Sequence, residues 1–277
     1  MVRLIYLLLG ACLAQAAPAS YFFLQFSDPQ LGMYEENRGF AQETANLEFA
    51  VSTANRLHPA FVVITGDLIN RAGDAAQAAE YHRITAKLDP GIPLYSVAGN
   101  HDVGNDPTPE SLAVYRERFG RDYYTFRSGD MVGFVLNSSL IGHPQKAPEE
   151  AAKQEAWLRA ELAKAKGEGV QRLIVFQHHS WFLQDPNEAD QYFNIPTETR
   201  KRYLALFHQY GVRHVFSGHY HRNDLGRDGS IEMITTGPVG KPLGEARSGF
   251  RVVTVGPAGL AHQFYDLGNL PNRISIQ

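Results

Sequence analysis

The sequence predicts an α/β layered fold, because strand-like and helix-like segments alternate along most of the chain. Short apolar runs with the length of buried strands are separated by stretches in which apolar residues recur at helical spacing. In residues 46–57, for example, Leu47, Val51 and Ala54 fall on one helical face. Towards the C-terminus, strand-like runs follow one another directly, which indicates a mixed sheet or two packed sheets.

Cap and turn residues set the limits of these elements. Asp74 is a good N-cap for a helix that runs to about Leu88, and residues 128–130 mark a hairpin turn. A helix over residues 197–210 opens with a capping-box pattern and ends at Gly211. Other helices are expected at 46–57, 110–119 and 149–166, and strands at 21–26, 61–65, 93–97, 123–127, 131–137, 172–176, 212–216, 231–236, 250–255 and 260–265.

Composition and charge are those of an ordinary globular protein. The 277 residues are 44% hydrophobic and 20% charged, with a formal net charge of −3. The pI near 6.4 gives no sign of the basic surface that a nucleic-acid-binding protein needs. No apolar run reaches the roughly 20 residues of a membrane-spanning helix, so no transmembrane span is expected.

The N-terminus has the pattern of an export signal, which we place at residues 1–16. Arg3 supplies positive charge, residues 4–13 form an apolar run, and residues 14–16 are a small-x-small cleavage motif. Cleavage would leave one domain over residues 17–277 in a periplasmic or secreted protein. Alternatively, residues 9–12 form a lipobox, and the chain is a lipoprotein anchored through Cys12. Because Cys12 is the only cysteine, the mature chain is not expected to use disulfides or thiolate chemistry.

Polar residues follow five of the expected strands at the point where each strand ends. In open α/β sheets, ligands gather at the carboxyl ends of the strands, so we expect these side chains to meet in one region. Carboxylates suit Mg²⁺ and Mn²⁺, whereas imidazoles suit Zn²⁺, Fe and Ni²⁺, so the mixed set predicts a site for divalent cations. The set comprises Asp28, Gln30, Asp67, Asn100, His178, His219 and His221.

Three glycines, Gly66, Gly99 and Gly218, precede predicted ligands and allow unusual backbone angles and close approach. A bridging carboxylate can hold two ions about 3.5–4 Å apart, an arrangement suited to phosphoryl chemistry. Each motif alone has a structural reading as a turn or a surface loop. The prediction therefore rests on their joint occurrence, in order, after five strands.

These motifs resemble those of the calcineurin-like metallophosphoesterases, and the resemblance covers residues 21–265. Segments such as VAGNHDVGN and VFSGHYHRN are similar to one branch of that superfamily. This is the calcineurin-like phosphoesterase domain-containing protein 1 branch, a group of Ser/Thr phosphatases. The branch also has Asp-x-Gln, here Asp28 and Gln30, where most relatives have Asp-x-His. The motifs that carry the resemblance are Asp28-x-Gln30, Gly66-Asp67, Gly99-Asn100-His101-Asp102, His178 and Gly218-His219-x-His221.

The resemblance implies a four-layer αββα sandwich with two mixed β-sheets flanked by helices, and two divalent metal ions (Mn, Fe, Zn or Mg). It implies that Asp28, Asp67 and His221 hold the first ion. Gln30 is then either a further ligand or the holder of a bound water. The second ion takes a set in which Asp67 bridges: Asp67, Asn100, His178 and His219.

The implied reaction is hydrolysis of a phosphate ester by a metal-bridging hydroxide. His101 is the candidate general acid for the leaving alkoxide, and Asp102 either orients His101 or is a turn residue. A phosphomonoesterase acting on small molecules or Ser/Thr phosphoproteins is favoured. The alternatives are a phosphodiesterase acting on nucleotides or lipid head groups, and a partner-binding member without activity. Residues 180–195 either wall the site or form a solvated connection.

Overall fold

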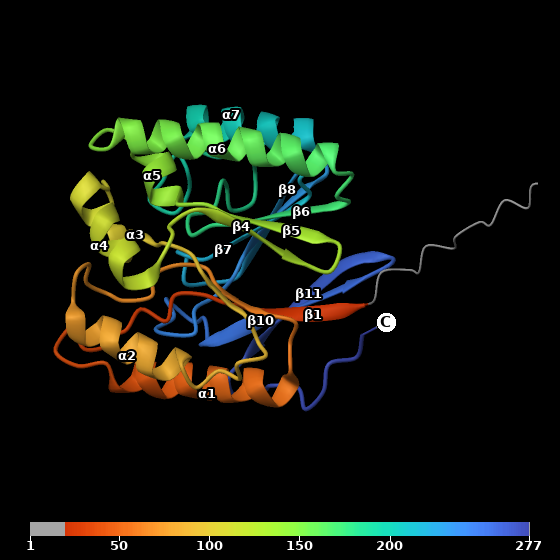
Figure 1. Cartoon of the computed structure of the whole chain (residues 1–277). Coiled ribbons are helices and arrows are strands. Elements are labelled where there is room, and N and C mark those ends of the chain that lie inside the picture. The colour runs from red at the N-terminus through yellow and green to blue at the C-terminus, as the bar shows by residue number, and fades with distance from the viewer. Residues whose placement is uncertain (1–19, 277) are drawn as a thin grey trace, which may run out of the picture.

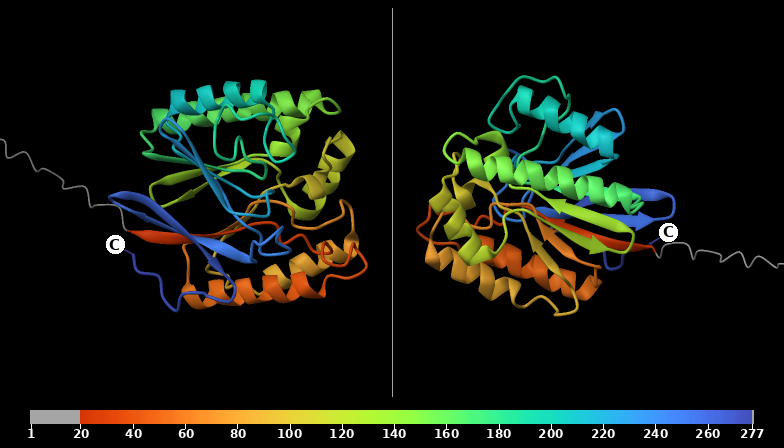
Figure 2. Two further views of the ribbon diagram at one scale, coloured as in Figure 1. Left: turned by 180° about the vertical axis from the view of Figure 1, so that it is seen from behind. Right: turned by 45° about the horizontal axis from the view of Figure 1, so that its top comes forward.

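Two β-sheets lie face to face, and helices cover the outer face of each sheet (Figures 1 and 2). The computed structural model describes residues 20–276. Helices α1 (Ala41–Leu57) and α2 (Ala75–Thr85) cover the first sheet, and α6 (Pro148–Gly167) and α7 (Thr197–Tyr210) cover the second. This is the four-layer αββα sandwich that the resemblance implies.

Both sheets are mixed: the second has parallel strands at its centre and an antiparallel strand at each edge, whereas the first has antiparallel strands only on one side and ends in a parallel strand on the other. The first sheet has the order β11-β10-β1-β2-β3, and the second has the order β4-β5-β6-β7-β9-β8. The strands of the first sheet are β1 (Tyr21–Phe26), β2 (Val62–Ile64), β3 (Leu94–Ser96), β10 (Gly249–Gly256) and β11 (Gly259–Asp266). Those of the second are β4 (Tyr124–Ser128), β5 (Met131–Val135), β6 (Arg172–Phe176), β7 (His214–Ser217), β8 (Asp224–Asp228) and β9 (Ile231–Thr235).

Strand β1 is buried on both faces, as a central strand of a sandwich must be. Phe23 packs between the two sheets, whereas Leu24 and Phe26 join the cluster under α1 and α2. Because side chains alternate along a strand, Gln25 lies on the same face as Phe23, between the sheets. Its buried amide is therefore an exception in a layer otherwise rich in phenylalanine.

The structure differs from the sequence prediction at a few elements. Strand β8 was not expected, since its sequence DLGRD lacks an apolar alternation. Two short helices that were not expected, α3 (Asn100–Val103) and α5 (Ser138–Gly142), begin just after β3 and β5. The helix expected at 110–119 is present as α4 (Pro109–Phe119). The capping box expected for α7 is wrong. Pro196 occupies the N-cap, and Asp190 Oδ1 accepts a hydrogen bond from the Thr197 amide at 2.8 Å instead.

The cap predicted for α2 is confirmed, because Asp74 accepts hydrogen bonds from the amides of Ala76 and Gln77. The expected signal segment, its cleavage site and Cys12 lie outside the described residues. Within residues 20–276, none of the helices combines the length and the apolar character needed to cross a bilayer.

The aromatic layer between the sheets should carry much of the stability. Phe23 is fully buried, stacks on Phe61 at a centroid distance of 4.5 Å, and meets Phe176 edge-on. Phe23→Ala should therefore lower the free energy of unfolding by about 3–5 kcal/mol, measured by urea titration. Phe49→Ala on α1 is the control, because Phe49 is 49% exposed. Equal losses in the two variants would contradict this role for the layer.

Candidate metal centre

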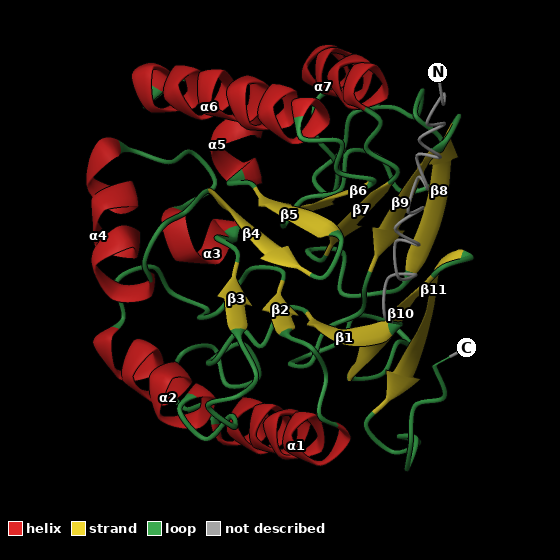
Figure 3. Ribbon diagram, turned by 45° about the vertical axis from the view of Figure 1, so that its right-hand side comes forward, coloured by secondary structure: helices red, strands yellow, loops and turns green. Residues whose placement is uncertain are grey.

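The carboxyl ends of β1, β2, β3, β6 and β7 meet at one edge of the sandwich. Strands β1, β2 and β3 run parallel in one sheet, and β6 and β7 run parallel in the other. Figure 3 shows β3 leading into α3, which begins at Asn100. The residues that follow these strands include every predicted ligand, each buried to 4% exposure or less: Asp28, Gln30, Asp67, Asn100, His178, His219 and His221.

Two groups of side chains have the geometry to hold a metal ion. The first consists of Asp28, Asp67 and His221, and the second of Asp67, His178 and His219. In each group, one ligand atom from every residue lies within 4.8 Å of the others. Asp67 belongs to both groups, which is the position that a bridging carboxylate requires. Asn100 adjoins the second group, since its Oδ1 lies 3.0 Å from His178 Nε2.

Main-chain carbonyl groups fix which nitrogen of each histidine is free to bind. His178 Nδ1 lies 2.9 Å from the Thr65 carbonyl, and His221 Nδ1 lies 2.5 Å from the Lys241 carbonyl. Carbonyl oxygens only accept, so these nitrogens carry the proton and leave Nε2 as the ligand atom. His219 is reversed, because its Nε2 lies 3.0 Å from the Tyr192 carbonyl and leaves Nδ1.

The surroundings of His178 Nε2 fit a bound cation. This nitrogen lies 3.2 Å from Asp67 Oδ2 and 3.0 Å from Asn100 Oδ1. Its Nδ1 already carries a proton, so Nε2 of the neutral ring is a lone pair facing two oxygen atoms. Either a second proton on the ring or a cation between these atoms must relieve that contact.

Gln30 also has an atom that fits a ligand role. Its Nε2 donates to Asn70 Oδ1 at 3.0 Å, which turns the amide oxygen the other way. That oxygen, Oε1, is buried and has no hydrogen-bond partner among the described residues. A buried acceptor left unpaired is costly, and a metal ion or its bound water would satisfy it.

The backbone is strained at most of the predicted ligands. Non-glycine residues rarely adopt positive φ, and each instance costs on the order of 1–3 kcal/mol. Five predicted ligands do so, and such strain persists only where the surrounding structure enforces it. They are Asp28 (φ 47°), Gln30 (40°), Asp67 (48°), His219 (66°) and His221 (54°).

The three predicted glycines are required by close packing around the ligands. A Cβ at Gly99 would overlap the Asp67 carboxylate, one at Gly66 would overlap the His178 ring, and one at Gly218 would overlap Ser27 and Asp28. Gly66 also has φ +89°. The close approach expected from the sequence is therefore confirmed at all three positions.

Burial and mutual charge perturb the titration of the cluster. Burial opposes protonation of His178, yet the Asp67 carboxylate outweighs it and raises the pKa of His178 to about 9. Burial also penalises the Asp67 charge, but His178 holds the pKa of Asp67 well below its usual range. Burial, together with His178, lowers the pKa of His219 to about 3. Burial raises the pKa of Asp28. Asp28 thus lacks a sufficient cationic partner of its own, which favours cation binding beside it.

His101 lies beside the centre without belonging to either ligand group. Its main-chain amide donates to Asp67 Oδ1 at 2.9 Å. Its ring Nδ1 lies 2.7 Å from the Asn70 carbonyl, so Nδ1 carries a proton and the ring orientation is fixed. The ring is half-buried. This arrangement suits a group that exchanges a proton through Nε2.

Asp102 does not hydrogen-bond to the His101 ring among residues 20–276. Its buried carboxylate accepts hydrogen bonds from the amides of Leu68, Ile69 and Gly99, at 3.0, 3.2 and 2.8 Å. It therefore joins the loop after β2 to the loop after β3. The sequence left two roles open for Asp102: orienting His101, or acting as a turn residue. These contacts favour the turn residue, which also holds two ligand-bearing loops together.

Tyr192 is a residue at the centre that sequence reasoning did not single out. Asn100 Nδ2 donates to its phenol oxygen at 3.2 Å, and its ring lies 4.7 Å from the His219 ring. The side chain is 58% exposed, so part of it borders solvent beside the predicted ligands. The aromatic content of residues 180–195 was the only signal, and it could not say which residue faces the centre.

The loop that carries Tyr192 is held in one conformation. The buried Arg200 guanidinium donates to the carbonyls of Pro186, Glu188 and Ile195. The Glu188 carboxylate accepts from the Leu183 amide at 2.9 Å. Residues 180–195 thus form a wall of the site, the first of the two readings that the sequence left open.

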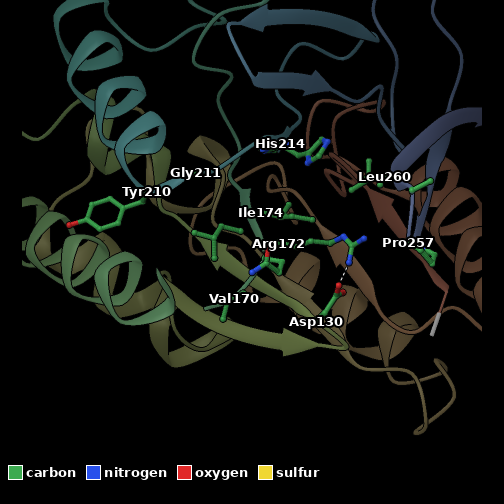
Figure 4. Close-up of a pocket in the computed structure, with 14 residues that line it drawn as sticks. Asp130, Val170, Arg172, Ile174, Tyr210, Gly211, His214, Pro257 and Leu260 are labelled. Carbon is green, nitrogen blue, oxygen red and sulfur yellow. Dashed lines mark ion pairs between the residues drawn. The ribbon is translucent and has the colours of Figure 1, made fainter. Parts of the chain in front are cut away.

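A cavity of about 460 Å³ lies against this loop and adjoins the centre through Tyr192, which lines it. It is lined by Asn105, Ser138, His143, His179, Asp190, Gln191, Tyr192, Asn194, Ile195 and Pro196. A larger cavity of about 630 Å³ lies at the amino ends of β6 and β7, around the ion pair of Arg172 and Asp130 (Figure 4). It is at the opposite end of these strands from the predicted ligands.

Comparison with known proteins identifies the family of this arrangement. The calcineurin-like phosphoesterase family model matches residues 23–223. The chain is 35% identical over 268 residues to the serine/threonine-protein phosphatase CPPED1 of Bos taurus, covering 91% of this chain and 86% of the relative. It is 36% identical over 269 residues to the protein of that name from Homo sapiens, with the same coverage.

Two solved structures share the fold at low sequence identity. A purple acid phosphatase from yellow lupin seeds superposes with a TM-score of 0.69 at 14% identity, covering 91% of this chain and 52% of that chain. A dimetal phosphatase from Danio rerio superposes with a TM-score of 0.61 at 17% identity, covering 89% of this chain and 99% of that chain.

Asp67 contributes to both ligand groups, so its replacement should affect both ions. Asp67→Asn should lose both ions after Mn²⁺ loading and desalting, whereas Asp28→Asn should retain one, measured by elemental mass spectrometry. Asp106→Asn is the control, because Asp106 lies outside both groups and pairs with Lys146. If Asp67→Asn and Asp28→Asn retain the same number of ions, Asp67 is not shared.

Proposed function

Because the chain belongs to the calcineurin-like phosphoesterases, a family of phosphate-ester hydrolases, we propose that it is a dinuclear metal-dependent phosphomonoesterase. The observation that carries the proposal is the pair of ligand groups that share Asp67. The ester is that of a small molecule or of a Ser/Thr phosphoprotein, since relatives at 34–36% identity are named serine/threonine-protein phosphatases.

The first ion would be held by Asp28, Asp67 and His221, with Gln30 Oε1 as a further oxygen donor. The second would be held by the bridging Asp67 with Asn100, His178 and His219. When bound, the two ions make water acidic enough to attack near neutral pH and neutralise charge on the phosphate oxygens. Three oxygen donors and one imidazole at the first position suit Mn²⁺, Mg²⁺ or Fe²⁺. Zn²⁺ also suits the second position, which has two imidazoles.

His101 would act as the general acid. The Asn70 carbonyl accepts from Nδ1–H and fixes the ring, so that a proton on Nε2 can be transferred to the leaving oxygen. The hydrogen bond from the His101 amide to Asp67 ties the acid to the bridging ligand. The distance between acid and centre is therefore set by the short backbone segment from Asn100 to His101.

The cavity beside Tyr192 favours a monoester whose leaving group carries no negative charge. No lysine or arginine lines it, whereas Asp190 does. A nucleotide or another polyanionic leaving group would meet no cationic side chain there. This observation sets the monoesterase above the phosphodiesterase that acts on nucleotides.

We also propose that residues 1–16 direct export, so that residues 17–277 form the mature phosphoesterase domain. The sequence pattern of that segment is the support. The intact mass of the protein from its native cells would test this. Loss of residues 1–16 without lipid indicates a periplasmic or secreted protein, a lipidated Cys12 indicates a membrane anchor, and an intact Met1 contradicts both.

The monoester preference can be measured directly. The Mn²⁺-loaded protein should hydrolyse p-nitrophenyl phosphate with kcat/KM more than about tenfold above that for bis(p-nitrophenyl) phosphate. Asp67→Asn should abolish both activities, which excludes a contaminating phosphatase. A preference for the diester would overturn the monoesterase proposal in favour of a phosphodiesterase. Absence of either activity in protein that holds two ions would support the partner-binding alternative.

The role of His101 depends on the leaving group. His101→Ala should lower kcat for phosphoserine by about 10²–10⁴-fold, because a serine alkoxide must be protonated as it departs. The loss for p-nitrophenyl phosphate should be much smaller, since nitrophenolate leaves without a proton. Metal content, measured in parallel, should be unchanged. Equal losses on the two substrates would remove His101 from the role of acid.

A further inference from the structure

A line of hydrogen-bonded, buried polar side chains runs within the layer between the two sheets and ends at Asp28. It begins at Arg251 in β10, which is 6% exposed. Arg251 Nε donates to Thr236 Oγ1 at 2.7 Å, and the Thr236 hydroxyl donates to Gln25 Oε1 at 2.7 Å. Gln25 Nε2 in turn donates to Thr65 Oγ1 at 3.0 Å. Arg251 and Gln25, which lie opposite each other on the paired strands β10 and β1, are thus linked through Thr236, which follows β9 of the facing sheet.

The second half of the line reaches the predicted ligand. Thr65 Oγ1 lies 2.9 Å from Ser27 Oγ, closer than the 3.2 Å to the Phe26 carbonyl. Ser27 Oγ donates to Asp28 Oδ2. Thr65, Ser27 and Asp28 are all fully buried, so no solvent molecule competes for these bonds.

The direction of every hydrogen bond follows from the chemistry of the groups. Arginine has donors only, so Thr236 must accept from Arg251 and has its own proton free for Gln25. The Ser217 carbonyl accepts from Gln25 Nε2 at 2.9 Å, which fixes the orientation of the amide. Thr65 accepts from that amide, so its own proton is free for Ser27. All donors therefore point from the guanidinium towards the carboxylate.

Both ends of the line are buried charges. The Arg251 guanidinium has no carboxylate within ion-pair distance among the described residues. Its other partners are neutral: Asn223 Oδ1 at 2.8 Å, the Thr235 carbonyl at 3.3 Å and His262 Nδ1 at 2.9 Å. The nearest carboxylate along this path is that of Glu232, whose Oε2 lies 3.5 Å from His262 Nε2. A buried polar network in an aromatic layer is costly to build and rigid once every member is paired. The cost of burying this network is explained if the network holds the Asp28 carboxylate, at its end, in a fixed position.

We propose that this hydrogen-bond line positions Asp28 for the first metal ion. Ser27 Oγ donates to Oδ2, and the His219 amide is shared between Oδ2 at 3.1 Å and Oδ1 at 3.2 Å. Oδ1, which accepts from no hydroxyl group within the described part of the chain and lies 3.5 Å from His221 Nε2, is then the oxygen presented to the ion. Ser27, Thr65, Gln25 and Thr236 are positioning residues in this scheme. The inference rests on the proposed function, in which Asp28 is a ligand of the first ion.

The test is titration of the metal-free full chain with Mn²⁺ by isothermal calorimetry. Asp28→Asn identifies the binding event that belongs to the first ion. Ser27→Ala should weaken that event by about 10- to 100-fold, as is typical when a residue that orients a ligand is removed. Thr65→Val and Thr236→Val should weaken it in the same direction, with the smaller effect at Thr236, which is more remote. The second event should stay unchanged.

Matched variants separate positioning from packing. Thr235→Val is the control for Thr236→Val, because both residues are fully buried neighbours. Within residues 20–276, the Thr235 hydroxyl bonds only to the hydroxyls of Ser180 and Ser217, outside the line. Thr236→Ser and Thr65→Ser keep the hydroxyl and lose the methyl group. If the line positions Asp28, serine restores first-site affinity and valine does not. If the threonines matter only for packing, valine is tolerated and serine is not.

Thermal unfolding of each metal-free variant confirms that the titrated protein is folded. Unchanged first-site affinity in Ser27→Ala, or equal effects of Thr235→Val and Thr236→Val, would overturn the inference while leaving the proposed function intact. If the unaltered protein binds fewer than two ions, the proposed function fails, and the inference fails with it.

Discussion

The arrangement of the centre depends on the hydrogen bonds and contacts of one residue, Asp67. Its main-chain carbonyl accepts from the Gln30 amide at 2.8 Å, its Oδ1 accepts from the His101 amide, and its Oδ2 lies beside His178. Asp67, in the loop after β2, therefore connects the loops after β1, β3 and β6. Because two of these loops belong to one sheet and the third to the other, Asp67 also links the sheets at this edge.

The rest of the molecule supplies the stability that this crowded region lacks. Positive φ angles at five predicted ligands, buried carboxylates and an unpaired amide oxygen all oppose folding. Three apolar clusters, one between the sheets and one beneath each helical layer, oppose that cost. Asp102 offsets part of it locally, since one carboxylate satisfies three main-chain amides.

The sequence predicted what depends on local pattern and missed what depends on tertiary contacts between separate segments of the chain. The predicted ligands follow strands in a recognisable order, and β1, β6 and α7 have the expected limits. Tyr192 could not be placed, because its position depends on a loop held by Arg200 from the next helix. The choice between two roles for Asp102 also needed the structure, since its partners Leu68 and Ile69 are distant in sequence.

The line from Arg251 to Asp28 belongs to a wider gradient of polarity between the sheets. Every second residue faces this layer, so β1 and the residues after it present Phe23, Gln25 and Ser27 in turn. The β2 segment presents Phe61, Val63, Thr65 and Asp67, and the β6 segment presents Ile174, Phe176 and His178. In each case the side chains change from apolar to polar towards the carboxyl end.

Buried polar side chains need hydrogen-bond partners, and residues of the facing sheet contact two of those in β1 and the loop after it. Thr236 donates to Gln25, and Ser27 packs against Gly218. The same alternation that builds the apolar layer thus delivers the hydrogen-bonded side chains of Gln25, Thr65 and Ser27 to the metal centre, and in β1 Gln25 is the residue at which the layer becomes polar.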